Sequence, residues 1–219
     1  MATRFYPDPT NAPSVSPGFG TWWDTTQAVR RKLVIDVPGN NGSTSFQVDE
    51  TATYIDTILV AQFVSEPLDA LDPIALEVIK GCFRILESNA KAEVTWRFRI
   101  RKCDGDGNND ADVNANSFSD TTEADDGGLT NRFMSKINQD DGAISQGQRL
   151  VIEVGFLFNY SKVSGYNATL SITDNHATDL GENDTDTTAY NSWIETGDTF
   201  TEASGEPAAI KLGPMFAFA

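Results

Sequence analysis

The chain has 219 residues and carries 32 acidic against 16 basic side chains, which gives a formal net charge of −16 at pH 7. A negative field of this size repels nucleic acid phosphates and anionic membrane surfaces, so it excludes both as general partners. Hydrophobic residues make up 39% and aromatic residues 10% of the sequence, which excludes a disordered chain and predicts a buried core. No apolar run approaches the roughly 18 residues of a membrane helix. The first residues also lack the long apolar core of a secretory signal.

Residues 1–24 are predicted to form an extended arm. Four prolines, at positions 7, 9, 13 and 17, fix φ and bias the preceding residues towards extended backbone, which argues against a helix. Such an arm is either disordered or lies on a surface, its own or a neighbour's. Its aromatic residues argue against pure disorder, and both arrangements stay open. We expect Phe5, Tyr6, Trp22 and Trp23 to make contacts between subunits.

Residues 25–219 are predicted to form a single all-β domain. In the clearest strand, at 92–102, apolar residues at even positions alternate with polar residues at odd positions. Both faces of the segment 148–160 are apolar in part, so this strand is expected at the centre of a sheet. Further strands are expected at 30–37, 53–64, 75–86, 131–137, 168–173 and 209–219.

These short strands, separated by turns rich in Gly, Asn and Asp, indicate an antiparallel β-sandwich of jelly-roll-like type. Two acidic loops, at 103–128 and 173–192, are longer than most connections in compact domains. Loops of this length are usually functional, disordered or packed against a partner.

The two cysteines, Cys82 and Cys103, are predicted to be free thiols. If the two flanking strands pair as a hairpin that turns near Ser88 and Asn89, the cysteines are out of register and too far apart for a disulfide. The sequence also contains no CxxC motif or cysteine cluster of the kind that binds metal.

The stretch CDGDGNNDADVNAN, which starts at Cys103, has an acidic or amide side chain at every second position. Calcium binds six to eight hard oxygen atoms, and this spacing in a tight loop can supply several of them. The bidentate Glu of an EF-hand is missing, since Ala115 stands at the twelfth position. The segment is therefore either a solvated loop or a cation site, most simply for Ca²⁺. The candidate ligands are Asp104, Asp106, Asn108, Asp110 and Asp112.

Arg97, Arg99 and Arg101 are expected to form a ladder on the outer face of the strand at 92–102. Acidic neighbours on adjacent strands can pair with this ladder, or it can dock an acidic loop of another copy. The only histidine, His176, lies in the second acidic loop. It is either part of a metal set with nearby carboxylates or an ordinary surface residue.

The sequence contains no GxSxG, GxxxxGK[ST] or HExxH motif, and with 32 acidic residues a pair of carboxylates carries no information about hydrolysis. We therefore predict that the protein is not an enzyme. Trp22, Trp23 and Trp193 offer an alternative, because tryptophans on a β-sandwich can stack on sugar rings. The apolar residues Met215, Phe216 and Phe218 of the C-terminal segment are expected to be buried at an interface.

Several stretches along the chain resemble small virion structural proteins of tailed bacteriophages. The stretches are RFYPDP, SPGFGTWWDTTQAVRRKL, QFVSEPL, RLVIEVGF and HATDLGENDTDTTAYNSWIE. The resemblance brings no active-site residues. It implies a protein that is assembled in the bacterial cytoplasm and contacts copies of itself and other virion proteins.

Two functions are therefore expected. The first is a structural component of a tailed-phage virion, as a capsid decoration or cement protein or in the tail, which acts by homo-oligomeric assembly. The alternative is a β-sandwich carbohydrate-binding module for host recognition, in which calcium assists glycan binding. Both share one fold, so the fold alone does not separate them.

Overall fold

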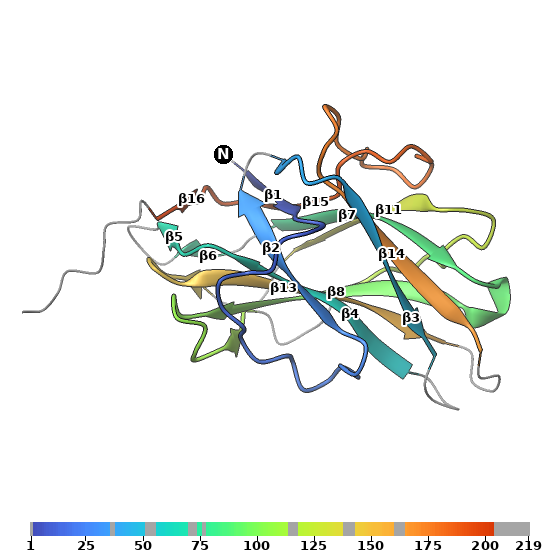
Figure 1. Cartoon of the computed structure of the whole chain (residues 1–219), viewed down its shortest axis with the longest axis horizontal. Helices are drawn as coiled ribbons and strands as arrows, with labels where there is room; N and C mark the ends of the chain where they lie inside the picture. The colour runs from blue at the N-terminus through green and yellow to red at the C-terminus, as the bar shows by residue number, and fades with distance from the viewer. Residues whose placement is uncertain are drawn as a thin grey trace, which may run out of the picture.

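The structure is a computed structural model, and it is built almost entirely from β-strands (Figure 1). The residues that it describes are 2–35, 38–50, 56–69, 74–75, 78–113, 118–137, 143–159 and 165–203. Within these ranges the only helical element is η1, a single 3₁₀ turn at Ala90–Ala92. None of the described residues belongs to a helix long and apolar enough to cross a membrane. The predicted all-β fold is confirmed.

Ten strands form the body of the fold and six are short. The body strands are β1 (Thr3–Pro7), β2 (Val29–Ile35), β3 (Ser43–Asp49), β4 (Asp56–Ser65), β7 (Val78–Glu87), β8 (Val94–Cys103), β11 (Thr130–Ile137), β13 (Arg149–Phe158), β14 (Asn167–Thr173) and β15 (Trp193–Thr196). The short strands are β5 (Leu68–Asp69), β6 (Ile74–Ala75), β9 (Ala111–Asp112), β10 (Phe118–Ser119), β12 (Ala143–Ile144) and β16 (Thr201–Glu202).

Strands β8 and β13 form where the sequence predicts them. On β8 the even-numbered side chains from Val94 to Ile100 are buried, as period-two alternation requires. All ten residues of β13 are buried, and the strand pairs with β4 on one side and with β8 on the other. One face of β13 lies in the core, and residues of the N-terminal segment cover the other face. The prediction of a central strand at this position is confirmed.

Twelve strands form one hydrogen-bonded sheet in the order β10-β8-β13-β4-β2-β1-β15-β7-β14-β3, with β9 paired to β8 and β11 paired to β7. The sheet bends so that β4, β8 and β13 face β7, β11 and β15, and β1 joins the two layers by pairing with β2 and β15. One feature differs from the predicted antiparallel arrangement, because β2 runs parallel to β4. The architecture is sandwich-like with a mixed sheet.

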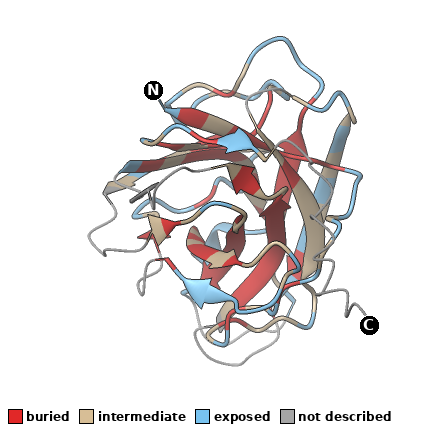
Figure 2. Cartoon of the chain, turned by 90° about the vertical axis from the view of Figure 1, so that its left-hand side faces the viewer, coloured by how far each residue is buried: buried red, intermediate tan, exposed pale blue. Residues whose placement is uncertain are grey.

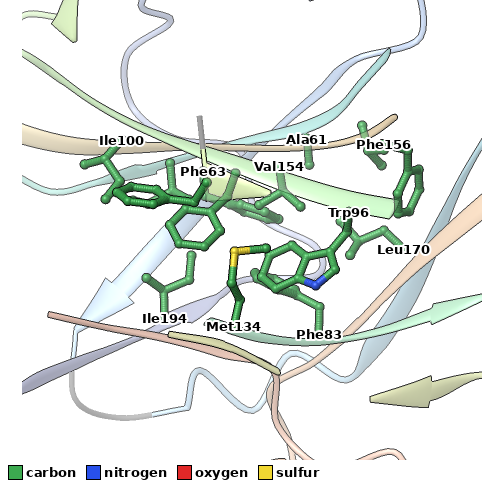
Figure 3. Packing of buried hydrophobic residues seen from close by; sticks show 14 of the residues in the cluster. Ala61, Phe63, Phe83, Trp96, Ile100, Met134, Val154, Phe156, Leu170 and Ile194 are labelled. Atoms are coloured by element: carbon green, nitrogen blue, oxygen red, sulfur yellow. The ribbon is translucent and has the colours of Figure 1, made fainter. Parts of the chain in front are cut away.

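The core fills the space between the two layers (Figure 3). Phe63 of β4 lies 6.2 Å from Phe83 of β7, and Phe83 lies 5.5 Å from Trp96 of β8, measured between ring centroids. Met134 and Ile194 point into the same space from β11 and β15. Figure 2 shows the result, with buried residues along the inner strands and exposed residues mainly in loops.

The N-terminal residues are not an independent arm, which corrects the predicted boundary at residue 24. β1 is an internal strand of the sheet, and the side chains of Phe5 and Tyr6 are 0% and 7% exposed in the core of their own chain. Residues 8–24, here called the strap, have no regular strand and lie on the outer face of β2, β4, β8 and β13. The arm is therefore extended as expected, but the surface that it covers is its own.

The cysteines are free and buried, as predicted, although the hairpin that led to the prediction does not exist. β7 pairs with β11, β14 and β15, and β8 pairs with β13, so the turn through η1 carries the chain from one layer to the other. Burial raises the pKa of Cys82 to about 12 and that of Cys103 to about 11, so both remain protonated at neutral pH.

Candidate functional site

The centre of the best-organised polar cluster is Glu153, a fully buried carboxylate in the middle of β13. Four groups donate hydrogen bonds to it: the backbone N–H of Gly20 at 2.8 Å, Trp23 Nε1 at 2.9 Å, Gln62 Nε2 at 3.0 Å and Arg101 Nη1 at 3.1 Å. Two of these donors belong to the strap and two to the sheet. Glu153 therefore fastens the strap to the sheet.

Backbone carbonyls of the strap complete the attachment. Gly18 O accepts hydrogen bonds from Arg101 Nη1 at 2.6 Å and from Gln62 Nε2 at 3.0 Å. Arg30 of β2 donates to Pro17 O at 2.9 Å, and its guanidinium lies 3.8 Å from the ring centroid of Phe19. The strap thus replaces solvent over the polar residues that β2, β4 and β8 place on the outer face.

A glycine on β13 makes room for the end of the strap. A Cβ atom at Gly155 would lie 2.3 Å from Trp23 Cζ3 and 2.3 Å from the carbonyl oxygen of Ile58. Trp23 is 7% exposed, and Trp22 stacks on it with a centroid distance of 3.8 Å. Trp23, which was expected at a contact between subunits, therefore has its side chain packed against the sheet of its own chain.

Two of the three arginines in the ladder, Arg99 and Arg101, form ion pairs within the chain. Arg101 forms ion pairs with Asp110, with Asp112 at 3.2 Å and with Glu153 at 3.1 Å. Arg99 pairs with Asp112 at 2.7 Å. Pairing with acidic neighbours is thus confirmed for these two arginines, and with its side chain only 7% exposed Arg101 is not available to another subunit.

The five candidate calcium ligands do not converge on one point, so of the two alternatives the structure favours the solvated loop. Asp110 and Asp112 face the arginines of β8, as described above. Asp104 accepts a hydrogen bond from Asn109 Nδ2 at 2.7 Å, whereas Asp106 accepts two from Asn108, at 3.0 and 2.9 Å. Throughout the described ranges no group of three or more His, Cys, Asp or Glu residues is placed to hold a metal ion.

This arrangement predicts that calcium does not stabilise the protein. Cation binding would require Asp110 and Asp112 to leave a guanidinium that already neutralises them, so no net free energy is gained. We expect the thermal midpoint to be the same in millimolar CaCl₂ and in EDTA, measured by differential scanning calorimetry. A midpoint that rises with calcium and saturates in the wild type, but not in an Asp104→Asn/Asp106→Asn variant, would contradict this expectation.

The second acidic loop covers the outer face of the other layer. Leu180 and Trp193 pack with Tyr6 and Cys82 in a small apolar cluster below it. The side chain of Asn131 on β11 is fully buried and holds the loop in place. Its Nδ2 donates to Gly181 O at 3.0 Å, and its Oδ1 accepts from the backbone N–H of Asp186 at 2.6 Å. This loop is packed against its own chain.

Arg4 adds an electrostatic attachment to the same face. Its guanidinium lies 4.0 Å from the ring centroid of Trp193 and forms ion pairs of 2.7 Å with both Asp179 and Glu195. His176 is exposed, and its ring lies edge-on to Tyr190 at 4.8 Å. Of the two alternatives for His176, a metal ligand or an ordinary surface residue, the structure favours the surface residue.

In the structure Trp22, Trp23 and Trp193 do not form an open platform for a sugar ring. Trp193 is 0% exposed and Trp23 7% exposed, and both are covered by segments of the chain itself. Trp22 is partly exposed, but it stacks on Trp23, and Arg99 lies 5.1 Å from its ring centroid.

The sequence analysis did not single out Glu153, Gln62 or Gly155 as site residues. A signal for the first is visible in RLVIEVGFLF, where one carboxylate interrupts a strand with two apolar faces. A carboxylate in such a place must be paired, because an isolated buried charge is too costly. Nothing local to Gln62 or Gly155 indicates that a distant segment lies over them.

Comparison with other proteins adds no further assignment. No protein-family model matches the chain, and no curated protein matches it at a significant level.

Proposed function

We propose that the protein is a structural component of a tailed-phage virion, a capsid decoration or tail-associated protein that acts by homo-oligomeric assembly and not by catalysis. The resemblance of the segments quoted above to small virion structural proteins is one support. The proposal places assembly in the bacterial cytoplasm, and its partners are copies of the same chain and other virion proteins.

The observation that supports it best is that the chain covers both outer faces of its own sandwich. The strap closes one face through Glu153, and the 173–192 loop closes the other through Asn131. Binding and catalytic sites for small molecules are concave and have convergent polar groups. Here the buried polar groups around Glu153 and Asn131 converge on the chain's own backbone and side chains, which suits a rigid building block.

The C-terminal segment supplies the proposed contact between subunits. Met215, Phe216 and Phe218 lie outside the described residues, and β16, which precedes them, ends at Glu202. A cluster of apolar side chains of this kind is more stable against a neighbouring copy than in water.

Deleting residues 204–219 is expected to abolish oligomers while leaving the β-structure intact. Analytical ultracentrifugation reports the first result and far-UV circular dichroism the second. The matched control is the full-length chain with Met215, Phe216 and Phe218 replaced by serine, which should behave like the deletion. Unchanged oligomers in both variants would contradict the role of this segment.

The decisive test of the proposal is peptide mass spectrometry on particles purified from the source. A copy number comparable with that of the major capsid protein supports a decoration or cement protein, and a much lower number supports a tail protein. Absence of the chain from purified particles would overturn the proposal.

A further inference from the structure

Arg97 on β8 differs from every other arginine of the chain. All nine arginines lie in the described ranges, and Arg97 alone forms no hydrogen bond or ion pair with a described residue. The other eight have these partners, among others: Arg4 with Asp179, Arg30 with Gln62, Arg31 with Pro9, Arg84 with Thr187, Arg99 with Asp112, Arg101 with Glu153, Arg132 with Asp120 and Arg149 with Glu66.

The surroundings of Arg97 make its isolation costly. It is only partly exposed, it lies opposite Gly155 on β13 and Ser119 on β10, and Trp23 covers the neighbouring glycine. Its Nε is shielded from solvent and meets no acceptor. Burial lowers the pKa of Arg97 from its ordinary value, as expected for a cation without a counter-ion. A carboxylate that reached it would remove this cost.

Carboxylates without a basic partner in the described part of the chain lie where the chain turns from β7 into β8. Glu87, Glu123, Asp125 and Asp126, here called the acidic corner, form no ion pair with any lysine or arginine that the structure describes. The last three are exposed. Burial, together with the neighbouring charges of Glu123 and Asp126, raises the pKa of Glu87 to about 8. At neutral pH Glu87 is therefore mostly protonated, and the negative charge of the corner is carried by Glu123, Asp125 and Asp126, which have no counter-ion among the described residues.

We infer that two copies of this chain pair about a twofold axis, with Arg97 of each copy meeting the acidic corner of the other. The two features lie at the same end of β8, because the backbone N–H of Val94 donates to Glu87 and Arg97 follows three residues later. A twofold interface requires that one surface carry both complementary features, so that the same contact forms twice. This inference rests on the proposed homo-oligomeric function and names one of its contacts.

The surface favours a carboxylate from a second copy over an acidic glycan. Trp22 stacks on Trp23, and Arg99 lies 5.1 Å from its ring centroid, so Trp22 offers no open ring for stacking. Each copy, by contrast, presents three exposed carboxylates in the acidic corner. An acidic glycan is retained as an outcome of the test.

Charge reversal on each side of the contact provides the test. Arg97→Glu alone and Glu123→Lys/Asp126→Lys alone should each weaken self-association of the full chain at low salt by at least about tenfold per contact, because each places like charges together. An equimolar mixture of the two variants should pair as tightly as the wild type, since both contacts then join opposite charges. Sedimentation velocity on the separate and mixed variants measures these effects.

Two controls separate the contact from general effects. Lys136→Glu on β11 changes the net charge by the same amount as Arg97→Glu, but at a position away from β8. It should leave association unchanged. Arg97→Met should weaken association without lowering the thermal midpoint, because it removes a partly buried cation that has no counter-ion.

Each other result has a definite meaning. Wild-type oligomers that survive both reversals, or a mixture that does not recover, would overturn the inference and leave the proposed function standing. A chain that is monomeric at all concentrations but present in particles would also overturn the inference and leave the proposed function standing. If it is also absent from particles, the proposed function fails as well. Loss of binding to uronic-acid glycans in Arg97→Glu, with association unchanged, would assign Arg97 to glycan binding instead.

Discussion

Replacement of Glu153 by alanine is expected to destabilise the protein by about 3–5 kcal/mol, the cost of removing one partner of a buried charged network. The substitution leaves the N–H groups of Gly20 and Trp23 and the amide of Gln62 with one acceptor fewer, and Arg101 loses its fully buried counter-ion. Each buried donor left without an acceptor adds its own desolvation cost. Equilibrium unfolding in urea, followed by far-UV circular dichroism, measures the change.

The same substitution should release the strap before the sheet unfolds. Hydrogen exchange at Gly20 should accelerate more than exchange in β13, and the fluorescence of Trp23 should shift towards the red as its indole becomes hydrated. The matched control is Glu182→Gln, which removes an ion pair of 2.8 Å with Lys80 from a side chain that is 45% exposed. Its expected cost is below about 1 kcal/mol. Equal effects of the two substitutions would show that Glu153 does not hold the strap.

Local sequence pattern predicted the strands that face the core. β8 and β13 were predictable because alternation over ten residues places one set of apolar side chains on one face. β3 was not predicted, because only Phe46 and Val48 of its seven residues are apolar, which is too short an alternation to stand out among Ser, Thr and Gln. β15 has only four residues, too few for a period to be visible.

The position of β1 could not be predicted from its own residues. Thr3 lies opposite Thr196 in β15, nearly the whole length of the described chain away, and Phe5 lies opposite Ile35 in β2. Prolines near the N-terminus indicate extended backbone and equally suit a strand, a strap or a free arm. Only the pairing with two distant strands decides among them.

The contacts of charged residues in the candidate site could not be predicted from local sequence either. The spacing of the aspartates from Asp104 to Asp112 suits calcium, but Arg99 and Arg101 on the adjacent strand are closer counter-ions for Asp110 and Asp112. Sequence identifies which residues are charged, whereas cross-strand register decides which charges meet. Arg97 and Arg101 are equivalent in the sequence pattern, and only the structure shows that Arg101 is paired with Glu153 whereas Arg97 has no partner among the described residues.

Glu87→Gln is expected to change how the stability of the protein depends on pH. The folded-state pKa of Glu87 is about 8, whereas its ordinary value is 4.5, so the folded protein holds this proton more tightly than the unfolded chain does. The stabilising contribution of the proton is therefore complete below about pH 4.5 and is lost as the pH rises to about 8. Across this window ionisation of Glu87 is expected to lower the free energy of unfolding by several kcal/mol, at most about 5 kcal/mol for the full difference between the two pKa values.

Glutamine imitates the protonated carboxyl group. Its carbonyl oxygen can still accept the hydrogen bond that the backbone N–H of Val94 donates to Glu87 in the wild type, at 2.9 Å. The variant should match the wild type near about pH 4.5 and be the more stable protein near about pH 9. Urea unfolding at several pH values measures the difference, with Asp125→Asn as the control for loss of an exposed charge in the same corner. Unfolding free energies that run parallel for the variant and the wild type would mean that Glu87 is ionised in the folded state. The acidic corner would then be more negative, and the attraction that we infer between it and Arg97 of a second copy would be stronger at neutral pH.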